Sequence, residues 1–93
     1  MDEQFKNYLI KAGYKITTPS GNPSTIYSYI KSIDKVCELE GFSWSELADN
    51  IETIVKQYDL GGTKEDLGNK SHKTVINALK RFQEFINNLT NYW

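Results

Sequence analysis

The apolar residues in the last third of the chain return every three or four positions. They begin within GNKSHKTVINALKRFQEFI, residues 68–86, and continue beyond it. Residues spaced in this way share one face of an α-helix, whereas a strand would alternate every second residue. We therefore expect a long helix after Ser71 with a broad buried face. Its expected members are Val75, Ile76, Leu79, Phe82, Phe85, Ile86 and Leu89.

Two amphipathic segments precede this helix. Residues 3–12 repeat apolar side chains with the helical period and stop at Gly13, a residue type that commonly ends helices. Residues 24–40 do the same before Gly41. Both segments are predicted to be helices that pack through one face. The expected buried positions are Phe5, Tyr8, Leu9 and Ala12 in the first, and Ile26, Tyr29, Ile30, Ile33, Val36 and Cys37 in the second.

A capping signal opens the remaining helix. In the sequence SWSE, the hydroxyl of Ser43 can accept from a free amide of the first turn, and Glu46 can reach back to the amide of Ser43. We expect one helix from this cap to about residue 58. Its predicted buried face consists of Leu47, Ile51, Ile54, Val55 and Tyr58.

Glycine and proline mark the connections between these helices. Residues 12–24 contain Pro19, Gly21 and Pro23, which predict a loop after the first helix. Residues 59–70 form a second, glycine-rich loop with space for one helical turn at 64–67. A length of 93 residues fits one domain. The expectation for residues 1–93 is a single all-α domain, a compact bundle of four principal helices.

The residue types argue against several functional classes. The apolar runs are far shorter than the ~20 residues that span a bilayer, and MDEQFKNYLIKAGYK lacks a signal-peptide core, so we expect a cytoplasmic protein without membrane association. Cys37 is the only cysteine and lies on an apolar stripe, which favours a core residue over a nucleophile. His72 is the only histidine, so no metal-ligand set is apparent. We expect no enzymatic activity, no metal and no cofactor.

Charge is distributed unevenly along the chain. Residues 34–52 hold six carboxylates and one lysine, whereas residues 64–81 hold five basic side chains and two carboxylates. Lys70 and Lys73 fall at the start of the last helix, where unpaired amides and the helix dipole are positive. A phosphate there would satisfy the amides and both lysines. The alternative interpretation is a solvated helix start beside a loop.

The order of the helical segments adds a resemblance. STIYSYIKSIDKVCELEGF, SWSELADNIETIVKQY and GNKSHKTVINALKRFQEFI together resemble the SAM-like core-binding domain of tyrosine recombinases and related amino-terminal helical domains of restriction-type and HNH endonucleases. The resemblance implies a helical domain whose last helix faces the DNA backbone with its start. The chain contains neither the recombinase catalytic residues nor a nuclease module, so the implied role is binding without cleavage. The residues implied to approach phosphate are Lys70, Ser71, His72, Lys73 and Asn77.

Two partner classes follow from these observations. For DNA, the basic residues of the same region complete the predicted site, namely Lys64, Lys80 and Arg81. For a protein with a basic groove, the acidic middle helix would mimic a phosphate backbone, as in a small interaction module or a phage-encoded inhibitor of a nucleic-acid enzyme. The predicted contacts of that alternative are Trp44, Glu46, Asp49 and Glu52. Aromatic residues beyond the needs of the core stripes favour it further, because interfaces are rich in them: Tyr14, Tyr27, Trp44, Tyr92 and Trp93.

Overall fold

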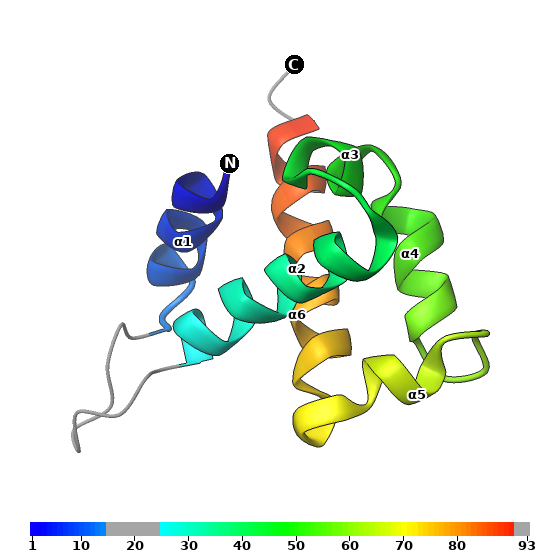
Figure 1. Cartoon of the computed structure of the whole chain (residues 1–93). Helices are drawn as coiled ribbons and strands as arrows, with labels where there is room; N and C mark the ends of the chain where they lie inside the picture. Colours follow the sequence, from blue (N-terminus) through cyan, green and yellow to red (C-terminus); the bar gives the residue numbers. More distant parts are fainter. Residues whose placement is uncertain (15–24, 91–93) are drawn as a thin grey trace.

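The computed structural model describes residues 1–14 and 25–90, without the side chains of residues 71, 72 and 90, and its regular elements there are all helices (Figure 1). The all-α class predicted from the apolar periodicity is thereby confirmed. Of the predicted loop 12–24, residues 15–24 lie outside the described residues. The helices are α1 (Asp2–Lys11), α2 (Thr25–Glu40), α3 (Trp44–Asp49), α4 (Ile51–Tyr58), α5 (Glu65–Gly68) and α6 (Lys70–Thr90).

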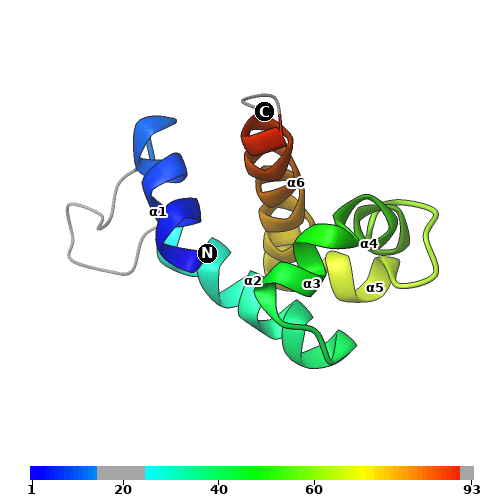
Figure 2. The same cartoon turned by 90° about the horizontal axis from the view of Figure 1, so that it is seen from above.

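The long helix α6 is the element around which the others pack. It contacts each of the other described helices, with α1 on one side and α4 and α5 on the other (Figures 1 and 2). Its predicted stripe is buried along the middle of the helix, from Val75 to Phe85. Leu89 was also predicted on this stripe and is 41% exposed. The end of α6 extends beyond α2, which crosses its middle, so Leu89 has less to pack against (Figure 1).

Local signals set the end of α2 and the start of α3 as predicted. Gly41 has a φ of +70°, and the amide of Phe42 donates to the carbonyl of Cys37 at 2.9 Å, closing the last turn of α2. Ser43 and Glu46 then form both bonds of the capping box. The Glu46 amide donates to the Ser43 hydroxyl at 3.2 Å, and the Ser43 amide donates to the Glu46 carboxylate at 3.0 Å.

The predicted third helix is divided into two at Asn50. This residue leaves helical geometry, with φ −114° and ψ 13°, and its amide donates to the carbonyl of Leu47. Its side-chain amide donates to the carbonyl of Glu46 at 2.9 Å, which satisfies an acceptor at the end of α3. α4 then starts in a new direction (Figure 2). The predicted buried face survives the break, because every one of its members is buried: Leu47, Ile51, Ile54, Val55 and Tyr58.

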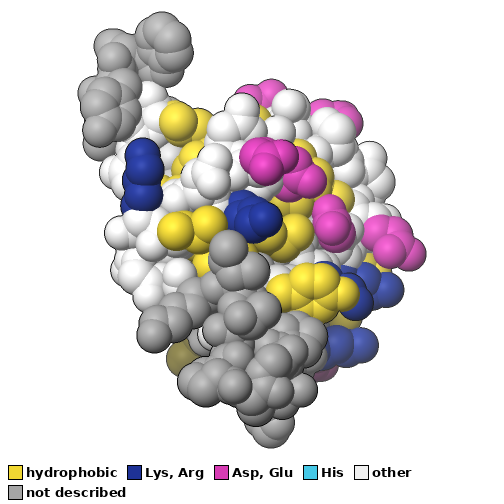
Figure 3. Space-filling view, turned by 90° about the vertical axis from the view of Figure 1, so that its left-hand side faces the viewer, with side chains coloured by type: hydrophobic (Ala, Val, Ile, Leu, Met, Phe, Trp, Pro, Cys, Tyr) yellow, Lys and Arg dark blue, Asp and Glu magenta, His cyan; other side chains and the backbone are white. Residues whose placement is uncertain are grey.

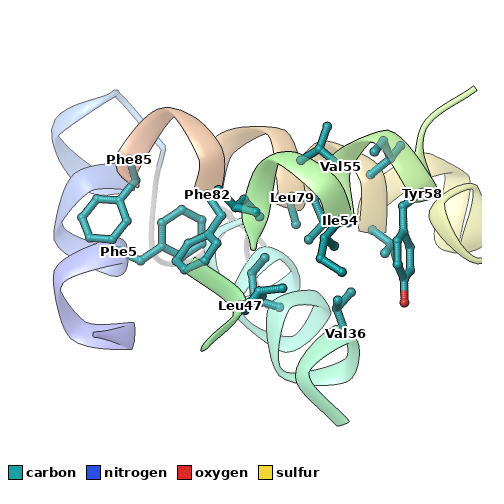
Figure 4. Close-up of a cluster of buried hydrophobic side chains, with 14 of the residues drawn as sticks. Phe5, Val36, Leu47, Ile54, Val55, Tyr58, Leu79, Phe82 and Phe85 are labelled. Carbon is teal, nitrogen blue, oxygen red and sulfur yellow. The ribbon is translucent and has the colours of Figure 1, made fainter. Parts of the chain in front are cut away.

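An aromatic cluster joins α1 to the rest of the core. The ring of Phe5 lies 5.2 Å from that of Phe82, and the indole of Trp44 lies 5.4 Å from Phe82, both nearly edge to face. Figure 4 shows Phe5, Phe82 and Phe85 together at one end of the core, with Tyr58 at the other. The contact of Phe5 with Phe82, which Trp44 also contacts, holds α1 against α6.

The first helix buries a narrower stripe than predicted. Phe5 and Leu9 are buried and Tyr8 is half-buried, but Ala12 is exposed. The difference arises because α1 ends at Lys11 and the chain turns at Gly13, which has a φ of +104°. Ala12 therefore belongs to the turn and not to the packed face.

The glycine-rich segment packs closely against the carboxyl end of α4; we call residues 56–68 the α4–α5 junction. A Cβ atom at Gly68 would lie 2.0 Å from the carbonyl oxygen of Tyr58, and one at Gly62 would lie 2.3 Å from that of Gln57. The amide of Lys64 donates to the Gln57 carbonyl at 2.7 Å. α5 is the single turn predicted at 64–67, and it requires glycine on both sides to approach α4.

Side chains tie this junction to α2. The hydroxyl of Tyr58, which is 1% exposed, donates to the Glu40 carboxylate at 3.0 Å. The Lys64 ammonium binds the same carboxylate oxygen and lies 5.7 Å from the centre of the Tyr58 ring. Burial, and then the neighbouring Glu40 carboxylate, raise the pKa of Tyr58 above its ordinary value. The junction is thus a closed cluster of opposite charges around a buried phenol.

Candidate nucleic-acid interface

An open groove of about 580 Å³ lies between α2 and the start of α6; we call it the α2–α6 groove. Three lysines line it, two from α2 and one from α6. Hydroxyl side chains and two carboxylates complete the lining. The lining residues are Ser28, Lys31, Ser32, Asp34, Lys35, Glu38, Lys70, Thr74 and Val75.

The first turn of α6 is set off from the remainder by one left-handed residue. Lys73 has a φ of +69°, a conformation that costs a residue with a side chain roughly 1–2 kcal/mol. Lys70 lines the groove, whereas Lys73 and Asn77 are exposed. The side chains of Ser71 and His72 lie outside the described part of the chain. Among the side chains described at this helix start, Lys70 is therefore the predicted one that the fold brings to the groove.

Three further basic residues of the predicted set are bound to carboxylates. The ion pairs are Lys64 with Glu40, Lys80 with Asp59 (Nζ to Oδ2, 3.4 Å) and Arg81 with Glu84 (Nη1 to Oε1, 2.7 Å). The pKa of Asp59 lies below its ordinary value, mainly because the amide of Leu60 donates to its carboxylate at 2.8 Å, with Lys80 adding attraction. These partners neutralise part of the positive charge that residues 64–81 carry in the sequence.

Two lysines of the groove, Lys31 and Lys35, were missed by sequence reasoning. They lie four residues apart on α2, so they project from the same face about 6 Å apart along the helix axis. Both side chains are exposed. The signal was present as Tyr27, Lys31 and Lys35 at four-residue steps opposite the apolar stripe. It was obscured because Lys35 lies inside the acidic stretch 34–52.

The two carboxylates of the groove differ in their surroundings. Asp34 accepts a hydrogen bond from the indole Nε1 of Trp44 at 2.7 Å, which ties α2 to α3. Glu38 is exposed. Cys37 lies on the buried side of the same helix, as predicted for a core residue, and burial followed by the Asp34 charge raises its thiol pKa to about 11. The groove therefore presents ammonium groups bounded by carboxylates.

The acidic residues of the alternative site belong to α3 and α4. Glu46, Asp49 and Glu52 are exposed; Glu46 also caps α3, and Glu52 pairs with Lys56 at 3.6 Å. Trp44 is half-buried against the rings of α1 and α6. On the face in Figure 3, acidic side chains gather toward the upper right, and basic side chains lie both beside them and at the lower right.

The aromatic residues considered for a protein interface have different surroundings. Tyr14 is half-buried, with its ring 5.8 Å from that of Tyr29. Tyr27, near the amino end of α2, is 49% exposed. Tyr92 and Trp93 lie outside the described residues. Among the described members of this set, Tyr27 is thus the most exposed.

The described side chains offer little that is suited to metal binding or nucleophilic catalysis. No three His, Cys, Asp or Glu side chains lie together as a metal-ligand set among those that the structure describes, which do not include the side chain of His72. The raised pKa of the buried Cys37 thiol disfavours the thiolate that a nucleophile requires. None of the helices within residues 1–14 and 25–90 is both long enough and apolar enough to cross a membrane.

Comparison with known proteins yields a part-length similarity. Over 80 residues, or 85% of this chain, the sequence is 38% identical to a phosphoglucosamine mutase of Chlamydia pneumoniae. The chain spans 16% of the length of that protein. No family model and no solved structure matches the chain.

Proposed function

We propose that this chain is a non-catalytic nucleic-acid-binding domain that holds a phosphate backbone in the α2–α6 groove. The observation that carries the proposal is the convergence of Lys31, Lys35 and Lys70 from two helices on one open groove. The resemblance of the chain to core-binding domains of tyrosine recombinases favours DNA as the ligand. The mutase similarity covers too small a part of that protein to carry its activity to this chain.

The groove lysines suit phosphate better than the basic residues that the sequence emphasised. None of the groove lysines belongs to an ion pair among the described residues, so binding a phosphate there breaks none of those pairs. Lys64, Lys80 and Arg81 would each have to leave a carboxylate first. Phosphate contacts by lysine release counterions from the nucleic acid, which provides most of the sequence-independent affinity. Lys73 is exposed at the other end of the α6 first turn, and its charge helps to lower the pKa of the Asp59 carboxyl.

The test is binding of a labelled DNA duplex by Lys31→Ala with Lys35→Ala, measured at two salt concentrations. Loss of two phosphate contacts should weaken binding to every sequence and reduce the slope of log K against log salt by about 2. The matched control is Lys6→Ala with Lys11→Ala, which removes the same charge from α1. Equal weakening by both pairs would assign the effect to net charge and overturn the groove.

A second candidate function is a protein-interaction module, or an inhibitor of a nucleic-acid enzyme, that uses the acidic face of α3 and α4. The observation that favours it is the exposure of Glu46, Asp49 and Glu52 on adjoining helices. Asp49→Lys with Glu52→Lys separates the two functions, since it leaves the capping box of Glu46 intact. It should strengthen nucleic-acid binding by removing repulsion, but abolish association with a basic protein.

A further inference from the structure

An exposed aromatic ring stands beside the groove lysines. Tyr27 lies one helical turn before Lys31 on α2, and the Lys31 ammonium is 5.2 Å from the centre of its ring. The next residue, Ser28, is part of the groove lining. The ring is 49% exposed, whereas every other described aromatic residue is buried or half-buried. A π-face and a phosphate-binding cation are thus presented together.

This pairing distinguishes between forms of nucleic acid. In a duplex the faces of the bases are covered by stacking, so a surface tyrosine outside the helix has no base face to contact. In a single strand the faces are open, and stacking on an aromatic side chain combines with a cationic track along the backbone. Tyrosine accepts any base in this way, because every base has a π-face.

The charges of the groove also fit one backbone better than two. Its lysines come from α2 and the start of α6, and the carboxylates of Asp34 and Glu38 belong to the same lining. Glu38 is exposed three residues after Lys35 on α2. These carboxylates repel any phosphate nearby, and a duplex, with two backbones, brings more phosphates close to them than a single strand does.

We propose that the α2–α6 groove binds single-stranded nucleic acid in preference to duplex, with one base stacked on Tyr27 and the adjoining phosphates on the groove lysines. This inference rests on the function proposed above and specifies its ligand. The shared chemistry is an unpaired base attached to a phosphodiester backbone, which either DNA or RNA supplies. Sequence preference is expected to be weak, because stacking and phosphate contacts read no base edges.

The experiment compares fluorescence anisotropy of the whole chain with three labelled probes: an oligothymidylate, an oligouridylate and a DNA duplex of equal length. At least one single strand should bind more tightly than the duplex, and the ranking of the two strands assigns DNA or RNA. Tyr27→Ala should weaken single-strand binding about tenfold and leave duplex binding unchanged. Tyr27→Phe should retain binding, because it keeps the ring.

Leu39→Ala is the matched control, since Leu39 is on the same helix and is also 49% exposed but has no ring. It should leave all three affinities unchanged. Duplex binding at least as tight as single-strand binding, or single-strand binding that Tyr27→Ala does not alter, would overturn this inference and leave the proposed function standing. Absence of binding to all three probes at low salt would overturn the proposed function itself.

Discussion

Lys64 and Lys70 are six residues apart in the sequence and have opposite surroundings in the fold. The Lys64 ammonium binds Glu40 and lies over the Tyr58 ring, inside the α4–α5 junction. Lys70 lines the open α2–α6 groove with the lysines of α2. One cation therefore holds three helical segments together, while the other faces a space that a ligand can enter. Equal charge in a sequence does not imply equal availability.

The difference has a physical origin in the two backbones. At the α4–α5 junction, glycine allows the chain to approach the carbonyls of α4, so the side chains that follow are held against α2. At the groove, the first turn of α6 ends at the left-handed Lys73, and no comparable closure brings a carboxylate onto Lys70 among the ion pairs of the described residues. Changes in the first region should affect stability, and changes in the second should affect binding.

The largest expected effect is at Gly68. A methyl group there would collide with the backbone of Tyr58 at 2.0 Å, and a carbonyl of α4 cannot move aside without disturbing the helix. Gly68→Ala should lower the free energy of unfolding by about 3 kcal/mol, which is a severe case of overpacking. Urea denaturation measures this. Gly61→Ala is the control, because it has open space around its Cβ and costs only the strain of its φ of +84°; similar losses for the two variants would contradict the close contact.

The next test replaces each of the two lysines, Lys64 and Lys70, by alanine in turn. Lys64→Ala removes the cation from the mostly buried Glu40 carboxylate and should cost about 2 kcal/mol of stability with nucleic-acid affinity unchanged. Lys70→Ala should change stability by less than about 0.5 kcal/mol and weaken nucleic-acid binding. Thermal melts and anisotropy on both variants provide the four values. The comparison fails if Lys70→Ala is the more destabilising change.

Tyr58 provides a pH test of the junction. Its pKa is held above the ordinary 10.0, chiefly by burial, so folding favours the protonated phenol. The contribution of this group to stability is complete below pH 10.0 and is lost as the pH rises above that value. Tyr58→Phe should cost about 1 kcal/mol near neutral pH through the lost hydrogen bond and should make alkaline unfolding less steep. An unchanged alkaline slope in denaturation curves at increasing pH would count against a buried phenol.

The smallest expected effect is at Glu38. Its carboxylate lines the groove and would repel a bound phosphate. Glu38→Gln keeps the shape of the side chain and removes the charge, so affinity for nucleic acid should rise by about twofold to threefold, corresponding to roughly 0.5 kcal/mol for an exposed charge. Titration at low salt resolves a change of this size. A fall in affinity would show that Glu38 helps to hold the groove lysines in place.

The parts of the fold that were predictable depend on neighbours in the sequence. The apolar repeat that includes Leu79 and Phe82 reports a helical face directly, and the cap at Ser43 involves residues three apart. The break at Asn50 was not predictable, because the apolar spacing continues through it from Leu47 to Ile51. The break depends on where the side-chain amide of Asn50 finds an acceptor.

The candidate site depends on contacts between distant parts of the chain and was less predictable. Lys64 meets Glu40 across 24 residues, and no local pattern announces this pair. The groove joins α2 to the start of α6, so the importance of Lys31 and Lys35 appears only when the two helices are packed together. Lys70 was predicted from its local position at the start of the last helix, and it also lines the groove.

The buried position of Cys37 allows the opening of α2 to be measured from the rate of thiol modification. It is the one cysteine in the chain, it is 8% exposed, and its pKa of about 11 makes thiolate about 100-fold scarcer at neutral pH than at the ordinary value of 9.0. A thiol reagent should therefore react mainly while α2 is transiently detached from the core. The rate of modification then reports how often this local opening occurs. Because the same helix carries Lys31 and Lys35, a ligand bound in the groove should make this opening rarer and slow the modification of Cys37.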